Sequence, residues 1–252
     1  MMTLPNGLLR PGLFPLSFLL FFSFHNLMST SSDPNISLIG CFYLVFENVI
    51  TSMPKGNVMM KLTELCSMKH NQVSALVQRL VDKPTPERDF FECLLNTLPL
   101  NFLENIYITD FISFRCRNIT CSMSFNIENI TRNTTILKLN LPLDIDNDVL
   151  TTEVEKWRQS IVACPECSHQ LPNYERSIQL PANLLIKQLN HTPGSMSSKL
   201  QFKSGGTIFI LQSAIIFRNG KFIFCKDLAN KPKTYYINKS IHYLFFTADK
   251  LV

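Results

Sequence analysis

Apolar residues recur at helical spacing in the first part of the chain. The clearest case is QVSALVQRLV at residues 72–81, where apolar positions lie three and four residues apart. A further helix is predicted to begin at Thr85, because Thr is a good N-cap, Pro86 suits the first turn and the acidic Glu87 follows. We therefore predict a mainly helical segment over residues 35–105. Its expected helical stretches are 39–50, 56–65, 72–81 and 85–95.

After residue 105 the pattern changes to alternation of apolar and polar positions with many β-branched residues, which is typical of strands. One short helix is expected at 151–162, and Asn219-Gly220 predicts a tight hairpin turn. Helices first and strands afterwards indicate an α+β domain. The predicted strands are 107–114, 122–127, 135–141, 176–180, 183–189, 207–217, 221–226, 234–238 and 243–247.

The N-terminal residues 1–34 are set apart by an apolar run of twelve at 13–24, preceded by Arg10. Twelve residues are too few to cross a membrane, so no membrane association is expected, but the length suits the apolar part of a signal peptide. Secretion is an open alternative, because the chain also holds eight cysteines and six N-x-S/T sequons. The sequon asparagines are Asn35, Asn118, Asn129, Asn133, Asn190 and Asn238.

Composition and charge narrow the classes of function. Of the 252 residues 46% are hydrophobic and 17% charged, as in a globular protein with a sizeable core. The net charge is +5, yet the basic residues are scattered along the chain and form no run. Nucleic-acid binding requires a cluster of basic residues with interleaved aromatics, so no nucleic-acid partner is expected.

Four cysteines are arranged in two pairs, CRNITC at 116–121 and CPEC at 164–167. Two such turns can bring four thiolates to one tetrahedral zinc ion, as in a zinc ribbon. The ligands would be Cys116, Cys121, Cys164 and Cys167, with His169 as a nearby substitute. Two disulfides in a secreted protein, or cysteines without a metal, are the alternatives that the spacing leaves open.

The order of motifs around these cysteines resembles that of ubiquitin-specific proteases. In that family the second Cys-x-x-Cys is followed by a polar stretch, a basic-aliphatic strand, Leu-Pro and a strand of the type L-I-x-L-K-R-F. Here CPEC is followed by ERSIQLPANLLIKQL at 175–189, with Asn190-His191 in place of the basic-aromatic pair. LNLPLD at 139–144 is similar to the family's L-x-L-P strand, and ERDFFECLL at 87–95 is similar to its Q-x-D-A-x-E-F-L helix.

This resemblance implies a papain-like cysteine protease hand. Residues 35–105 would form a helical thumb, residues 106–175 the β-rich zinc-ribbon fingers, and residues 176–252 an antiparallel β palm. In the family, ubiquitin lies in the hand with its C-terminal tail in the cleft between thumb and palm. Ubiquitin or a ubiquitin-like protein is therefore the expected partner, in the cytoplasm or nucleus.

The catalytic residues implied by the resemblance are only partly present. Cys41 in GCFY at 40–43 is similar to the nucleophile of the G-N-T-C-Y box, although a buried helix cysteine is an equal alternative, and Asn35 could supply the oxyanion-hole amide. Lys221 stands where the G-H-Y box has its catalytic His, and an ordinary lysine is a cation that cannot act as a base at neutral pH. Asn238 in TYYINKS holds the orienting position, and His242 in the last strand is interpreted as structural.

We therefore expect a ubiquitin-specific-protease-like domain that recognises ubiquitin or a relative and has lost deubiquitination. One alternative is an active cysteine-type deubiquitinase whose base lies elsewhere in the chain. A second, of another class, is a secreted disulfide-bonded glycoprotein. An eroded gene product without activity is a third.

Overall fold

The structure is a computed structural model. It describes residues 37, 38, 40, 41, 44–46, 95, 100–171, 173–190, 195–197, 199–226 and 240–249. The predicted helices at 56–65 and 72–81, the predicted strand at 234–238, the N-terminal residues 1–34, Asn35 and Asn238 lie outside these residues. The described residues of the first predicted helix (40, 41 and 44–46), together with 37 and 38, are helical, as is Leu95. No described helix is long and apolar enough to cross a membrane.

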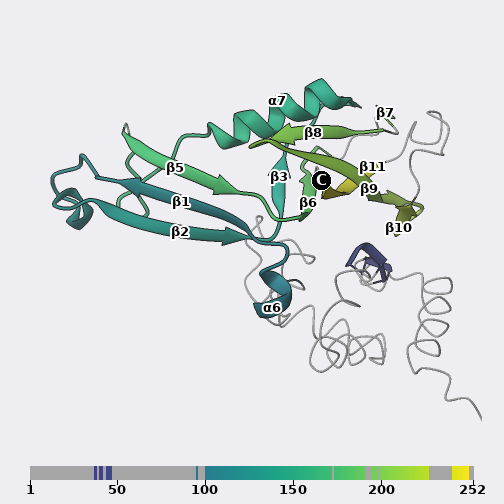
Figure 1. The fold of residues 1–252 in the computed structure, drawn as a ribbon, viewed down its shortest axis with the longest axis horizontal. Helices are drawn as coiled ribbons and strands as arrows, with labels where there is room; N and C mark the ends of the chain where they lie inside the picture. Colours follow the sequence, from purple (N-terminus) through teal and green to yellow (C-terminus); the bar gives the residue numbers. More distant parts are fainter. Residues whose placement is uncertain are drawn as a thin grey trace, which may run out of the picture.

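A three-stranded antiparallel sheet forms an arm that extends away from the rest of the described chain (Figure 1). Its strand order is β2-β1-β5, and β1 pairs with both neighbours along nearly its whole length. Apolar side chains at the far end of this arm pack around the four cysteines of the two pairs in a small core of their own. The strands are β1 (Ile108–Phe114), β2 (Glu128–Thr134) and β5 (Tyr174–Gln179).

The larger sheet has the order β10-β9-β11-β6-β3, with β8 paired to the first part of β9. All its pairings are antiparallel except that of β3 with β6. A two-stranded parallel pair, β4 (Asp144–Ile145) with β7 (Ser195–Met196), lies beside it. The strands of the larger sheet are β3 (Leu137–Leu139), β6 (Asn183–Gln188), β8 (Gln201–Ser204), β9 (Thr207–Arg218), β10 (Lys221–Lys226) and β11 (Ser240–Asp249).

The helix α7 (Asn147–Arg158) lies over β8 and β3 and covers one side of the larger sheet (Figure 1). Asp146 caps it by accepting a hydrogen bond of 2.8 Å from the backbone N–H of Val149. Leu150 and Val154, four residues apart, are buried against the sheet core. The helix therefore begins four residues earlier than the predicted 151–162, because the cap sits at Asp146 and not at Thr151.

The described helical residues that precede β1 pack onto the larger sheet through aromatic contacts. The ring of Phe46 lies 5.5 Å from that of Phe245 in β11 and 5.6 Å from that of Phe102 in the short helix α6 (Leu100–Leu103), in both cases edge to face. The described elements are thus mostly strands with few helices, in agreement with an α+β fold. Their arrangement within a papain-like hand stays a prediction.

One predicted strand, 122–127, is wrong. Residues Ser122–Ser124 form a single 3-10 turn (η1), and the strand β2 begins only at Glu128. The backbone N–H of Ser124 donates to the carbonyl of Cys121, so the chain here continues the cysteine turn and has no ladder to join. The alternation of apolar and polar residues at 122–127 therefore does not mark a strand, because its apolar residues Phe125 and Ile127 are exposed at the turn.

Candidate functional site

Four cysteine thiols from distant parts of the chain meet at the end of the three-stranded sheet. The sulfur atoms of Cys116, Cys121, Cys164 and Cys167 all lie within 4.8 Å of one another, a group that can hold one metal ion. The Sγ–Sγ distances are 3.5 Å for Cys116 and Cys167 and 3.7 Å for Cys121 and Cys164, far longer than a disulfide bond of about 2.05 Å. All four are free thiols, and the arrangement of four convergent sulfurs fits a tetrahedral metal such as zinc.

Backbone turns hold the cysteines in this arrangement. In the first pair the N–H of Cys121 donates to the carbonyl of Asn118 at 2.9 Å. In the second pair the N–H of Ser168 donates to the carbonyl of Cys164 at 2.9 Å, and Ser168 adopts a left-handed backbone with φ of 57°. The Cys164 N–H in turn donates to the carbonyl of His169. His169 thus contributes its backbone, while its exposed side chain is not among the clustered ligands.

The surroundings change the acidity of these thiols in different directions. A hydrogen bond with the backbone of His169 lowers the pKa of Cys167 to about 7. Burial raises the pKa of Cys121, and the carboxylate of Glu166 at 3.1 Å from its Sγ raises it further. Glu166 also accepts a hydrogen bond from Ser122. A bound divalent metal would favour all four thiolates, because the sulfur ligands of zinc are deprotonated.

Cys41, the predicted nucleophile, is fully buried in the described helix. Burial, with a smaller contribution from the nearby Cys225 in β10, raises its pKa to about 12. A thiol in this state is almost entirely protonated at neutral pH and cannot be reached by a substrate. Cys41 is thus a buried helix cysteine in this structure, and its role as the nucleophile stays a prediction.

A different side chain of that helix lies against β10. The hydroxyl oxygen of Ser37 accepts a hydrogen bond of 3.0 Å from the backbone N–H of Phe222, the residue after Lys221. This contact joins the helix to the edge strand of the larger sheet, next to the residue at the predicted His position (Figure 1). Sequence reasoning missed Ser37, although Asn35 stands two positions before it, as the Asn stands before the Cys in the family's box.

An imidazole also lies beside this contact. His242 occupies an irregularity of β11 between Ile241 and Tyr243, and its ring is perpendicular to that of Phe222 with centroids 5.3 Å apart. Its Nε2 is 3.2 Å from the hydroxyl of Ser240. The structure thus brings together Ser37, Lys221 and Phe222 with His242, while Asn35 and Asn238 lie outside the described residues.

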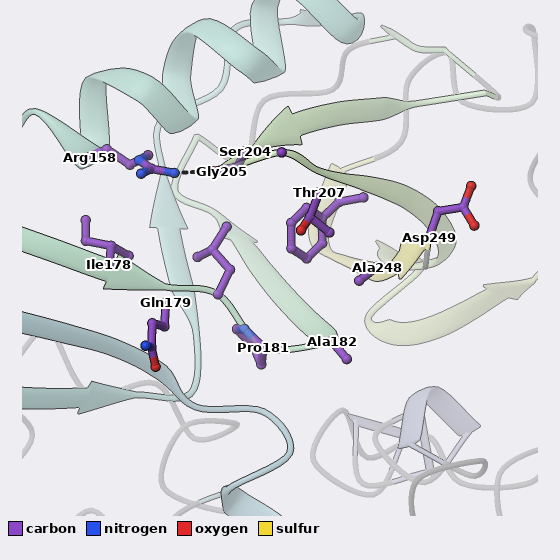
Figure 2. A pocket seen from close by; sticks show the side chains of 13 residues that line it. Arg158, Ile178, Gln179, Pro181, Ala182, Ser204, Gly205, Thr207, Ala248 and Asp249 are labelled. Carbon is purple, nitrogen blue, oxygen red and sulfur yellow. Dashed lines mark hydrogen bonds between the residues drawn. The ribbon is translucent and has the colours of Figure 1, made fainter. Parts of the chain in front are cut away.

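A hollow of about 820 Å³ opens where the three-stranded sheet meets the larger one (Figure 2). Arg158, at the end of α7, donates a hydrogen bond to Ser204 across one side of it. Gly205 and Gly206, in the turn between β8 and β9, line the hollow next to this contact, and Ala248 and Asp249 at the end of β11 line it as well. Its lining residues are Arg158, Ile178, Gln179, Leu180, Pro181, Ala182, Ser204, Gly205, Gly206, Thr207, Phe209, Ala248 and Asp249.

No family model matches this chain, and no curated protein matches it. Among solved structures it is similar to the Saccharomyces cerevisiae PAN2 pseudoubiquitin-hydrolase, with 13% identity and a TM-score of 0.46 over 84% of this chain and 83% of that one. It is also similar to a chain of the SAGA Ubp8/Sgf11/Sus1/Sgf73 DUB module bound to ubiquitin aldehyde (11% identity, TM-score 0.39, 91% of this chain). A third neighbour is an essential yeast splicing factor (13% identity, TM-score 0.40, 72% of this chain).

The first and second of these neighbours are ubiquitin-hydrolase modules. The chain spans 67% of the length of the matched DUB-module chain and 53% of that of the splicing factor. All three TM-scores lie below 0.5, so this likeness by itself identifies neither a family nor an activity.

Proposed function

We propose that this chain is a ubiquitin-specific-protease-like domain that binds ubiquitin or a ubiquitin-like protein without hydrolysing it. The observation that carries this proposal is the hydrogen bond between Ser37 and the backbone of Phe222, which puts a hydroxyl, not a thiol, against the strand residue that follows Lys221. The order of motifs from residue 87 onward supports the family, and the four-cysteine group supports the fingers that the family implies. The cluster's four sulfurs suit a structural zinc ion.

The chemistry of the groups around Ser37 argues against hydrolysis. A serine hydroxyl becomes a useful nucleophile only with a base that removes its proton, and a lysine side chain in the place of the family's histidine is ordinarily a cation and not a base. Cys41 and Cys225, the cysteines of the described helix and of β10, are both buried. The Nε2 of His242 is hydrogen-bonded to the hydroxyl of Ser240, and its ring packs against Phe222. These contacts are typical of a structural histidine.

Hydrolysis is tested with the zinc-loaded full chain and two fluorogenic substrates, a ubiquitin ester and a ubiquitin amide. We expect no release of fluorophore above buffer. Cleavage that Ser37→Ala abolishes would reveal a working serine nucleophile, and cleavage that Cys41→Ala abolishes would restore the alternative of an active cysteine deubiquitinase. The variant His242→Ala distinguishes a catalytic from a structural imidazole if either activity is found.

Binding is tested by titrating isotopically labelled ubiquitin with the full chain and following its NMR spectrum. We expect localised shifts at ubiquitin's hydrophobic patch and C-terminal tail. A ubiquitin whose hydrophobic patch carries polar replacements is the matched control and should show none. Absence of shifts at millimolar concentration, for ubiquitin and for related modifiers, would contradict the proposal.

We place the protein in the cytoplasm or nucleus, where free thiols persist. This is supported by the four clustered cysteines, which are thiols at distances that no disulfide spans. If the protein is secreted instead, Asn129 and Asn133, two sequon residues exposed on β2, should carry glycans. A glycosidase-sensitive mass shift at these sites together with no titratable thiol would overturn the proposed location.

A further inference from the structure

Exposed apolar side chains are concentrated at the far end of the three-stranded sheet. Ile119, Phe125 and Ile127 lie within nine residues of one another and are 86%, 73% and 71% exposed, and Ile161 is 68% exposed. Eight large hydrophobic residues are exposed in the described part of the chain, so half of them belong to this small region. Such a concentration is typical of a surface that a partner covers.

Two hollows lie at the same end of the sheet and share Arg117. The first, of about 520 Å³, is lined by Arg115, Cys116, Arg117, Ile119, Ser124, Phe125 and Asn173. The second, of about 810 Å³, is lined by Arg117, Ile161, Ser168, His169, Gln170, Leu171 and Tyr174. We call Arg115, Arg117, Ile119, Phe125 and Ile161 the finger-tip surface.

The finger-tip surface carries positive charge. Neither hollow has an Asp or Glu in its lining, whereas two arginines line the first and one of them also lines the second. Arg115 is fixed in place, because its Nε donates a 2.8 Å hydrogen bond to the carbonyl of Ser124, next to Phe125. Glu166 bonds to Ser122 and lines neither hollow. A metal centre with four thiolates has a formal charge of −2, but Cys116, Cys121 and Cys164 are buried while both arginines are exposed.

We propose that the finger-tip surface binds an acidic protein segment that carries apolar side chains. Its carboxylates would pair with Arg115 and Arg117, which can each hold a carboxylate with two parallel hydrogen bonds. Its apolar side chains would cover Ile119, Phe125 and Ile161 and enter the two hollows. A peptide in extended form advances about 3.3 Å per residue, so a segment of about ten residues reaches about 33 Å.

A protein segment fits this surface better than a nucleic acid does. Single-stranded nucleic acid needs several cations along a groove and aromatic rings on which bases stack. The finger-tip surface has two arginines, two isoleucines and one exposed aromatic ring, Phe125, and the rings of His169 and Tyr174 also line the second hollow, but two cations are too few to follow a nucleic-acid backbone. Isoleucines give no stacking platform but do bury well against leucine or phenylalanine side chains.

The test measures fluorescence anisotropy of a labelled ten-residue peptide that alternates Asp or Glu with Leu or Phe. It is titrated with the zinc-loaded full chain at low salt. We expect saturable binding that weakens at least ten-fold in Arg117→Glu and in Phe125→Ser. Matched controls are Arg132→Glu and Leu143→Ser, an exposed arginine of β2 and an exposed leucine outside the hollows, which should stay within two-fold of the parent.

Each other outcome overturns the proposal. No binding of the acidic peptide, equal binding of a peptide with Lys in place of the acidic residues, or equal losses in the control variants would contradict it. Tighter binding of a ten-nucleotide uridine RNA would assign the surface to nucleic acid. Concentration-dependent dimerisation that Phe125→Ser prevents would assign it to a second copy of this chain. Zinc content and circular dichroism of each variant show that its fold is kept.

Discussion

At the scale of single residues, Cys41 shows how burial controls the chemistry of a thiol. Its pKa rises from an ordinary value of 9.0 to about 12 because the buried site disfavours the thiolate. We expect a maleimide reagent at pH 7.5 to leave Cys41 unlabelled in the folded protein and to label it fully in denaturant, as read by mass spectrometry. Rapid labelling in the folded state would show an accessible thiol and revive Cys41 as a nucleophile.

The same burial gives Cys41 a pH dependence with a definite sign. The folded pKa lies above the unfolded one, so the stabilising effect of the protonated thiol is complete below pH 9 and is lost as the pH rises toward 12. The loss amounts to about 1.4 kcal/mol for each pH unit within that window. Wild type should therefore lose more unfolding free energy than Cys41→Ala between pH 9 and 11 in denaturant titrations. Parallel curves would contradict the burial.

Gln188 is a second residue whose side chain has a specific structural role. Its Oε1 accepts from the backbone N–H of Leu141 and its Nε2 donates to the Leu141 carbonyl, both at 2.8 Å, inside the protein. Gln188→Leu leaves both backbone groups buried without a partner, so we expect a loss of about 2–4 kcal/mol of unfolding free energy. The matched variant Gln212→Leu changes an exposed side chain and should cost less than about 0.5 kcal/mol. Equal losses would contradict this role.

The positions of the residues around Ser37 and Lys221 could be predicted from the sequence only in part. The position of Lys221 at the start of β10 follows from its place after the Asn219-Gly220 turn, a local signal that the sequence contains. The placement of Ser37 against Phe222 joins residues 185 positions apart. Cys41 was predicted as the nucleophile from its similarity to the G-N-T-C-Y box, and it too lies near β10, close to Cys225, but it is fully buried.

At the scale of elements, the hairpin of β9 and β10 was predicted correctly because its turn is chemically unambiguous. Asn219 and Gly220 both have positive φ, 51° and 77°, and Arg218 pairs with Lys221 across them. Since a Cβ at Gly220 would meet no atom within 4 Å, Gly220→Ala costs only backbone strain, about 1 kcal/mol. Gly220→Asn should cost less, because Asn tolerates this conformation better. Chemical denaturation of the two variants checks the order, and a larger loss in Gly220→Asn would contradict it.

The cysteine turns show where a hydrophobic pattern fails to predict secondary structure. Segment 122–127 has the alternation of a strand, yet Phe125 and Ile127 point into solvent at the finger-tip end. Nothing in the local pattern distinguishes apolar residues of a sheet core from those of an exposed surface. By contrast, the six residues of β10 and the first residue of β9 were predicted exactly where they occur, because turn residues bound both strands.

At the scale of the whole molecule, one ion-pair network connects the arm to the helix. Arg176 in β5 forms two hydrogen bonds with Asp110 of β1, at 2.8 and 2.9 Å, and donates to the backbone carbonyls of Arg158 and Ser160. Its guanidinium also lies 5.6 Å from the ring of Trp157. One planar side chain thus ties two strands of the arm to the end of α7. Lysine at this position could not reproduce these directed contacts.

The arm and the larger sheet nevertheless have largely separate cores. We therefore expect metal removal to destabilise the arm more than the larger sheet. The arm's core consists mainly of Ile112, Phe114, Val162 and Leu171 around three of the cysteines, whereas twenty buried residues, among them Ile108 at the base of β1, form the core around the larger sheet and α7. A core this small would gain much of its stability from a metal bound by the four thiols. We expect the purified protein to contain one zinc per chain, and chelation to speed amide hydrogen exchange about a hundred-fold in β1, β2 and β5.

In β9 and β11 the exchange rates should change less than three-fold, because these strands pair with each other and share the larger core. Cys164→Ser should give the same pattern without a chelator, whereas Cys225→Ser, a buried cysteine of the larger core, should speed exchange in β9 and β10 and leave the arm protected. Loss of protection in both sheets at the same chelator concentration would mean that the metal stabilises a single cooperative unit. An arm that stays protected without any bound metal would show that its fold does not depend on a metal.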